Sequence, residues 1–112
     1  EPVWKSASAR RQQMVYEVKW TAEAHEDLLD LFDYLIENVS AREAGRICST
    51  VFDSTRYLSD FPRLYEETPQ YGRGVRRIGV MGQNVLYEVD DVARQVKVLA
   101  VNGQRENPRN IR

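Results

Sequence analysis

Three short runs of β-forming residues fill most of the C-terminal half of the chain and constrain its fold more than any other feature. They cover residues 75–81, 84–89 and 95–101, and each is rich in Val, Ile, Leu or Tyr. Gly, Asn or Asp residues bound the runs, and the turns between them are tight. The pattern predicts a three-stranded antiparallel meander.

The segment before the meander begins with one strand and one helix. Residues 15–20 alternate between apolar and polar side chains in places, which is typical of a half-buried strand. Thr21 can then cap a helix over residues 22–38. One face of this helix is apolar and the remainder carries acids, which we interpret as a solvated surface rather than a metal site.

A second helix is predicted from a capping box, in which Ser40 caps the helix and Glu43 reaches back to it. Apolar residues recur at three- and four-residue steps to about residue 59. The short link between the two helices predicts an antiparallel helical hairpin. The fold class is therefore α+β, in the order β-α-α-β-β-β, with the helices covering one face of a small sheet.

The apolar stripes also predict a core and an open surface. Leu28 and Phe52 should be buried where the helices meet the sheet. Cys48 lies on an apolar stripe and is interpreted as a buried structural thiol. The strand at 84–89 carries apolar side chains on both faces: Val85, Tyr87 and Val89 on one face and Leu86 on the other. Since helices cover one face only, we expect an apolar strip to remain open for a partner.

The charge is nearly balanced overall, at −1, but it is unevenly distributed. Residues 21–62 carry nine acids and three bases, whereas residues 63–112 carry six acids and nine bases. A domain that grips nucleic acid usually has a strongly basic balance, because phosphate neutralisation dominates its affinity. The composition therefore disfavours a dedicated nucleic-acid-binding domain, although a local basic face is compatible with it.

Cysteine content and hydropathy indicate the compartment. The single cysteine cannot form an internal disulfide, which fits a reducing, cytoplasmic setting. No apolar run approaches the roughly 20 residues that a membrane span requires. No cluster of His and Cys residues, nucleophile elbow or phosphate-binding glycine loop is present, so no metal or other cofactor is expected. The one histidine, His25, is interpreted as a surface residue of the first helix.

Several short motifs occur in an order that resembles one protein family. These are Ala24, Asp27-Leu28 and Tyr34 on the first helix, Leu58, Phe61 and Pro62 after the second, Gly74-Val75-Arg76, Val85-Leu86-Tyr87, and the stretch from Val98 to Arg105. Together they resemble the RelE/ParE superfamily of bacterial toxins, from Val15 to about Glu106. The resemblance implies a toxin of a type II toxin–antitoxin module.

The RelE-like branch of that superfamily cleaves mRNA on the ribosome, and the resemblance implies which positions would carry the chemistry. Arg105, in the run Gln-Arg-Glu, matches one catalytic arginine and is the candidate catalytic residue if the protein is a nuclease. The second arginine is replaced by Asn84, and the frequent histidine by Asn102. The C-terminal tyrosine falls at about Ile111. Acid–base catalysis needs groups that transfer protons, and neither amide nor isoleucine can do so.

The ParE-like branch acts by binding DNA gyrase and lacks the nuclease residues, so the resemblance favours it. The protein is therefore expected not to be an enzyme. We expect contact with a target or partner from Arg76, Arg77, Asn84, Tyr87, Arg105 and Arg109. Arg76 and Arg77 should point to opposite faces of their strand, so that one meets solvent. Two structural alternatives remain: Arg76 could simply pair with a carboxylate, and the basic tail could be a frayed terminus.

The expected organisation is a toxin domain over residues 14–106 and a basic tail over 107–112. Residues 1–13 are an upstream extension, a cloning remnant or a piece of a fused partner. The resemblance further implies a cognate antitoxin, expected to be of the ribbon-helix-helix type, and DNA gyrase as target. The alternatives are a ribosome-dependent mRNA endonuclease with an altered active site, and a non-toxic homologue that acts only as antitoxin partner and co-repressor.

Overall fold

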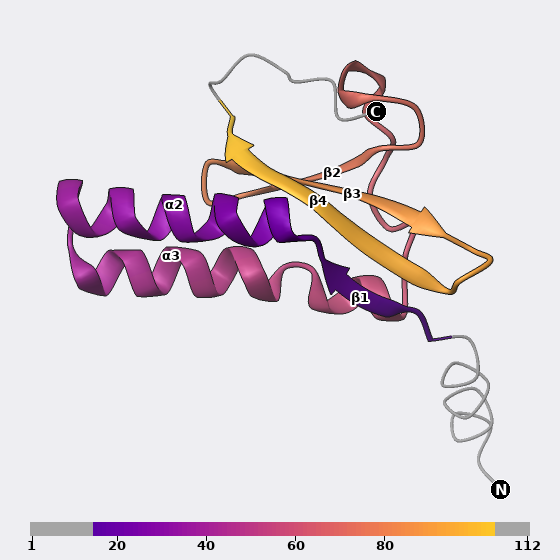
Figure 1. The fold of residues 1–112 in the computed structure, drawn as a ribbon, viewed down its shortest axis with the longest axis horizontal. Helices are drawn as coiled ribbons and strands as arrows, with labels where there is room; N and C mark the ends of the chain where they lie inside the picture. The colour runs from indigo at the N-terminus through magenta and orange to yellow at the C-terminus, as the bar shows by residue number, and fades with distance from the viewer. Residues whose placement is uncertain (1–14, 105–112) are drawn as a thin grey trace, which may run out of the picture.

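The computed structural model describes residues 15–104, which form an α+β fold (Figure 1). The chain order β-α-α-β-β-β is the one predicted. The elements are β1 (Glu17–Trp20), α2 (Ala22–Asn38), α3 (Ala41–Asp53), β2 (Arg76–Val80), β3 (Gln83–Asp90) and β4 (Gln95–Gly103), with 3₁₀ helices at Arg56–Ser59 and Pro69–Tyr71.

The four strands form one mixed sheet in the order β1-β4-β3-β2. β2, β3 and β4 make the predicted antiparallel meander. β1 lies parallel to β4, with Trp20 opposite Val98, so the first strand of the domain lies beside the last. β1 and β2 are therefore the two edges of the sheet, and the hairpin of α2 and α3 lies against one face of it (Figure 1).

Both helices begin at the predicted caps. Thr21 Oγ1 accepts a hydrogen bond from the Ala24 N–H at 3.2 Å, and Ser40 Oγ accepts one from the Glu43 N–H at 3.1 Å. The capping box is only half formed, because the Glu43 carboxylate pairs with Arg46 at 2.6 Å rather than reaching back. The hydroxyl of each cap satisfies one of the N–H groups that a helix leaves without an internal partner.

α2 has the predicted bounds, and all of its acids except Asp27 are exposed as predicted; Asp27 departs from the predicted solvated surface because its carboxylate accepts from the Val101 N–H of β4 at 2.9 Å. The exposed acidic residues are Glu23, Glu26, Asp30, Asp33 and Glu37. His25 is exposed on the same helix, as predicted. No helix within residues 15–104 is both long and apolar enough to cross a lipid bilayer.

α3 ends at Asp53, earlier than the predicted end near residue 59. Ser54 Oγ donates to the Val51 carbonyl at 2.6 Å, and Thr55 Oγ1 donates to the Phe52 carbonyl at 2.9 Å. Hydroxyls that bond to nearby backbone carbonyls offer the chain an alternative to further helix. The chain continues as the 3₁₀ helix Arg56–Ser59, which keeps Leu58 fully buried.

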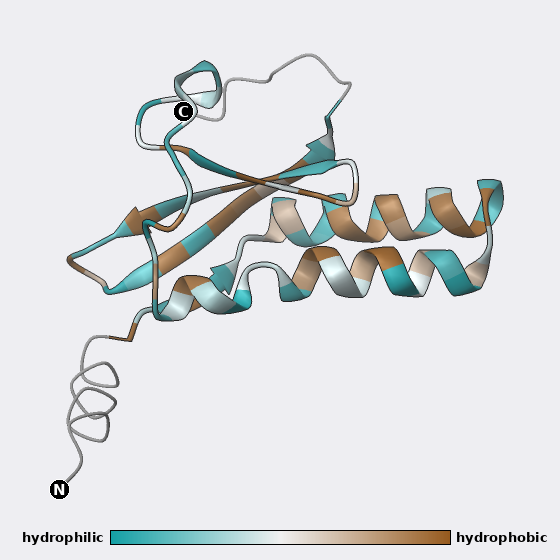
Figure 2. Ribbon diagram, turned by 180° about the vertical axis from the view of Figure 1, so that it is seen from behind, coloured by the Kyte–Doolittle hydropathy of each residue, from teal (hydrophilic) through white to brown (hydrophobic). Residues whose placement is uncertain are grey.

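Apolar side chains are buried on both faces of the sheet. Figure 2 shows apolar segments along its strands. The main core, between helices and sheet, contains Ala24, Val51, Leu58, Ile78, Val85, Tyr87, Val96, Val98 and Val101. On the other face, Tyr71 packs with Val75, Leu86 and Ala100. The predicted open strip around Leu86 is therefore wrong, because Leu86 is fully buried in this second cluster.

The prediction for Phe52 is also wrong, since 49% of its surface is exposed. Phe52 lies in the last turn of α3, where it stacks on Trp20 at the edge of the sheet instead of entering the main core. Leu28 is half-buried and packs against that core. Cys48 is buried as predicted, and burial raises the pKa of its thiol, which makes it a poor nucleophile.

Candidate functional site

Arg76 and Arg77 lie on opposite faces of β2, as the period of a strand requires. Arg76 donates to the Tyr65 carbonyl at 2.6 Å and pairs with Glu67 at 3.6 Å, and only 16% of its side chain is exposed. Arg76 therefore anchors the loop that precedes β2. This agrees with the structural alternative from the sequence, in which Arg76 pairs with a carboxylate. Arg77 is exposed and donates to Asn84 Oδ1 at 3.2 Å.

Asn84 lies at the centre of a buried polar cluster on the sheet face opposite the helices. Its Nδ2 donates to the Tyr71 hydroxyl at 3.1 Å and to Asn102 Oδ1 at 3.2 Å. Asn84 and Asn102 are direct cross-strand neighbours on β3 and β4. Asn84 is only 3% exposed, and its contact with Arg77 links this buried cluster to the solvent-exposed arginine.

Tyr87 offers no surface to a partner in this conformation. Its side chain is fully buried in the main core, and this burial is the chief reason that its pKa is raised. Its register opposite Arg76 places it under the helices rather than on the polar face. Arg105 and Arg109, the other predicted contacts, lie outside the described residues.

The polar cluster includes two of the positions at which the resemblance places nuclease residues, Asn84 and Asn102. Asn84 and Asn102 carry neutral amides, which neither titrate nor supply a cation. Arg77 is the cation that contacts Asn84. Among residues 15–104, no group of three His, Cys, Asp or Glu side chains is placed to hold a metal ion. The described part of the cluster offers amide hydrogen-bond donors and acceptors and the positive charge of the Arg77 guanidinium.

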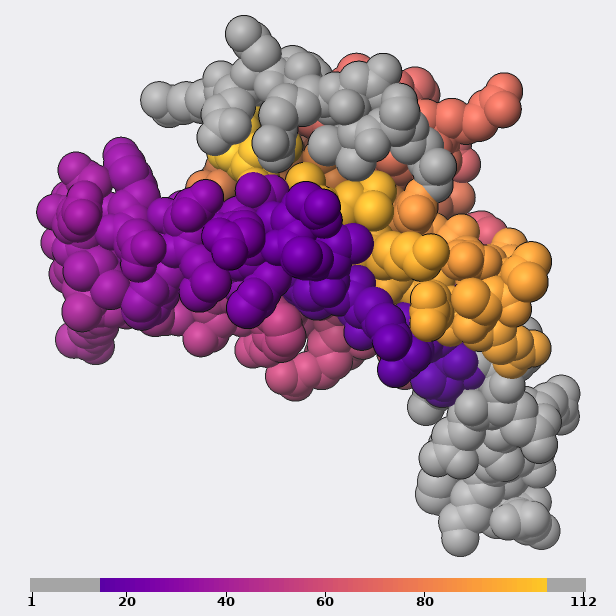
Figure 3. All heavy atoms as spheres, in the orientation of Figure 1, coloured from indigo at the N-terminus to yellow at the C-terminus, as the bar shows by residue number. Residues whose placement is uncertain are grey.

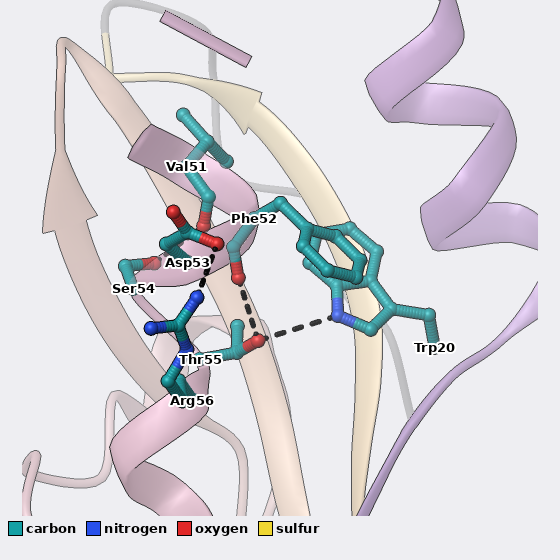
Figure 4. A network of polar contacts seen from close by, with 7 residues as sticks. All are labelled: Trp20, Val51, Phe52, Asp53, Ser54, Thr55 and Arg56. Carbon is teal, nitrogen blue, oxygen red and sulfur yellow. Dashed lines mark hydrogen bonds and ion pairs between the residues drawn. The ribbon is translucent and has the colours of Figure 1, made fainter. Parts of the chain in front are cut away.

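A groove of about 640 Å³ runs beside β1 and was not foreseen from the sequence. Trp20 and Phe52 stack in it with ring centroids 5.2 Å apart and planes 28° apart. Figure 4 shows how Thr55 joins them: its Oγ1 accepts from Trp20 Nε1 at 3.3 Å and donates to the Phe52 carbonyl. The other lining residues are Val15, Tyr16, Glu17, Val18, Asp53, Arg56, Ser59, Ala93 and Arg94.

The backbone of β1 faces this groove along its outer edge, and the strand is visible at the surface beside β4 (Figure 3). Glu17 N donates to the Arg94 carbonyl and Thr21 N to the Val98 carbonyl, so the odd-numbered residues bond to β4. The N–H groups of Val18 and Trp20 consequently point away from β4. At the start of β1, Ser59 closes the edge by bonding both backbone groups of Tyr16.

These sites lie on a hairpin of helices packed against a small sheet, a fold shared with chains of two solved toxin–antitoxin structures. A chain in the structure of the chromosomal ParDE toxin–antitoxin system of P. aeruginosa superimposes with a TM-score of 0.71 at 16% identity, covering 80% of this chain and 97% of that one. A chain of the toxin–antitoxin complex RelBE2 of Mycobacterium tuberculosis superimposes with a TM-score of 0.62 at 24% identity, covering 80% of this chain and 99% of that one. No curated protein sequence matches the chain.

The sequence itself shows the family. A model of the ParE toxin of the type II toxin–antitoxin system parDE matches residues 18–108. The chain therefore belongs to the ParE toxin family, within the RelE/ParE superfamily that its motifs resemble.

Proposed function

We propose that this protein inhibits DNA gyrase by binding to it, and that a cognate antitoxin keeps it inactive. Membership of the ParE family supports the class of protein, and the ParE-like motifs favour gyrase as the target. On this proposal the protein acts in the cytoplasm without a cofactor. The antitoxin is expected to be of the ribbon-helix-helix type.

The Asn84–Asn102 pair is the observation that favours inhibition by binding over RNA cleavage. A nuclease of the RelE type needs a cation and proton-transferring groups around the ribose and the scissile phosphate. Here the two positions hold amides that bond to each other across 3.2 Å. Acid–base assistance contributes roughly 10²–10⁴-fold and one charge-stabilising donor roughly 10²–10³-fold, a deficit too large for one arginine to make good.

The groove beside β1 is the surface on which we place the antitoxin. An extended segment could bond to the outward N–H groups of Val18 and Trp20 and extend the sheet by one strand. An apolar side chain of that segment would then cover the exposed face of Phe52. This location replaces the strip around Leu86, which the second cluster fills.

A gyrase supercoiling assay and a translation assay test the proposal together. The purified protein should inhibit supercoiling, and inhibition should be relieved by the product of the adjacent gene. Arg77→Ala and removal of residues 105–112 should each weaken inhibition. Arg46→Ala, which removes an exposed arginine from α3, is the matched control and should not.

Ribosome-dependent mRNA cuts that vanish on Arg105→Ala would overturn the proposal in favour of a nuclease. If the protein neither inhibits supercoiling nor causes mRNA cleavage but still binds the antitoxin, it is instead a non-toxic partner and co-repressor. If Arg77→Ala leaves inhibition of supercoiling unchanged, the polar face around Arg77 does not contact gyrase.

A further inference from the structure

α2 carries a second apolar stripe, most of which the domain leaves exposed. Its first stripe packs into the buried clusters through residues such as Leu28 and Leu35. The second stripe follows steps of three, four and three residues and consists of Leu29, Phe32, Ile36 and Val39. Leu29, Ile36 and Val39 are exposed over 46%, 43% and 59% of their surfaces. Apolar residues at these steps are typical of a helix face that packs against another helix.

The second stripe lies on the face of the helical hairpin that is turned away from β4. Asp27 accepts from the Val101 N–H and therefore marks the side of α2 that faces β4. At about 100° per residue, Leu29 and Ile36 lie roughly 180–200° around the helix from Asp27. The hairpin also projects beyond the sheet towards the turn between its two helices (Figure 1).

α3 adds small residues to the same face. In an antiparallel pair of helices, the residues that directly follow the contacting ones lie on the same side of both helices. Leu35 and Ala44 share one buried cluster, so Ile36 and Gly45 lie on one face. A Cβ added at Gly45 would meet no other atom within 4 Å, so the space above it is open.

The charges beside this face differ in sign between the two helices. Asp33 and Glu37 are exposed beside the stripe of α2, and Arg42 and Arg46 are exposed beside Gly45 of α3. Arg46 pairs with Glu43 of its own helix, whereas Arg42 and Glu37 form no ion pair within residues 15–104. One half of the face is therefore large, apolar and acidic, and the other half is small and basic.

We propose that a second copy of this chain docks on this face, related to the first by a two-fold axis parallel to the helices. Such an axis places α2 of one copy over α3 of the other, so that the two unlike halves of the face meet twice. The turn lies at Val39 and Ser40, so Glu37 and Arg42, which are equally far from it, lie at the same height. Glu37 of each copy then meets Arg42 of the other, and Ile36 packs over Gly45.

A second copy matches this face better than other partners because the face is complementary to itself. A nucleic acid is disfavoured, since the acids of α2 repel phosphate. The face shares none of the residues discussed here with the groove beside β1, where the antitoxin is placed. The dimer therefore does not depend on the proposed function, and it leaves that groove open.

Sedimentation equilibrium of the full chain at several protein and salt concentrations tests the dimer. The protein should associate reversibly to a dimer, and salt should weaken the association. Arg42→Glu and Glu37→Arg should each raise the dissociation constant about tenfold or more, because two like-charge pairs replace two ion pairs. Asp30→Arg makes the same charge change as Glu37→Arg at an exposed acid further around α2, and it should not.

An equimolar mixture of the Arg42→Glu and Glu37→Arg proteins should dimerise again, because both ion pairs reform between unlike copies. Misfolding of either variant could not produce this rescue. A wild-type protein that stays monomeric at its highest soluble concentration would overturn the proposal, as would a mixture that does not recover. If such a monomer loses antitoxin binding on Ile36→Ser, the face belongs to the antitoxin instead.

Discussion

Trp20 and Phe52 form a stacked pair that joins an edge strand to the last turn of α3, with ring centroids 5.2 Å apart. Phe52 is half exposed, so the pair stabilises the fold less than a core contact of the same size would. Its exposed face lies in the groove beside the open edge of β1. An apolar surface of this kind, adjacent to an unpaired strand edge, is typical of a site that receives a peptide.

Phe52→Ala should therefore destabilise the domain only modestly, by about 1–2 kcal/mol, since an aromatic pair adds about 0.5–1.5 kcal/mol and half the ring is already in water. Leu58→Ala is the contrasting variant, because Leu58 is fully buried, and it should cost about 2–5 kcal/mol. Chemical denaturation of both variants measures the difference. A Phe52→Ala loss as large as that of Leu58→Ala would contradict the placement of Phe52 outside the core.

Thr55 should be sensitive to loss of its hydroxyl rather than to its size. Its Oγ1 is the acceptor for Trp20 Nε1, and the residue is 3% exposed. Thr55→Val keeps the shape but leaves the indole N–H without this partner, at a cost of about 1–3 kcal/mol. Thr55→Ser keeps the hydroxyl and should cost less. Unfolding followed by tryptophan fluorescence compares the two, and equal losses would mean that the bond contributes nothing.

Asp91 should make the folded state sensitive to acid. Arg63 pairs with its carboxylate at 2.6 Å and Tyr16 donates to it at 2.7 Å, and these hydrogen bonds lower its pKa. A lowered folded-state pKa stabilises the fold above the pKa of the unfolded chain, roughly 3.9, and this contribution is lost as the pH falls through the lower folded value.

The stability difference between wild type and Asp91→Asn should thus shrink as the pH falls from 7 towards 2. Denaturant melts across that range measure it. Asp33→Asn, on the exposed face of α2, is the control, and its difference should be small at pH 7. A difference for Asp91→Asn that stays constant down to pH 2 would show that its charge is not what stabilises the fold.

The order and type of the helices and strands could be predicted from the sequence because they depend on local features such as caps and hydrophobic periodicity. The bounds of α2 were predicted because a hydroxyl cap and a 3.6-residue period mark them in the sequence. The end of α3 was missed because the apolar period continues past Asp53 while Ser54 and Thr55 bond to the backbone. Periodicity alone could not show that Phe52 lies beyond the core, since that depends on where β1 joins the sheet.

The candidate site was less predictable because it depends on contacts between distant segments. The strand period correctly separated Arg76 from Arg77. It could not show that Tyr71, from the loop before β2, packs over this face and bonds to Asn84. The resemblance placed Tyr87 among the candidate contacts, but it could not show that the helices cover this side chain. A second feature, the parallel pairing of β1 with β4, makes β1 the sheet edge beside the groove, and no local pattern in the sequence predicts that pairing.

The edge of β1 offers the sharpest test of where the antitoxin binds. Val18 N–H points away from β4, so Val18→Pro removes an outward donor while the bonds to β4 remain. The variant should fold with a loss of about 1–2 kcal/mol but should fail to bind antitoxin by strand addition. Lys19→Pro is the matched control, because its N–H points towards β4, and it should damage the sheet itself.

Affinity for the antitoxin and the free energy of unfolding must be measured on the same preparations. A folded Val18→Pro protein with much weaker antitoxin binding would agree with strand addition at β1. Unchanged binding by this folded variant would exclude a hydrogen bond from the Val18 N–H to the antitoxin, because proline lacks that donor. The antitoxin would then depend on the remaining groups of the groove, and Phe52→Ala would become the variant that weakens it.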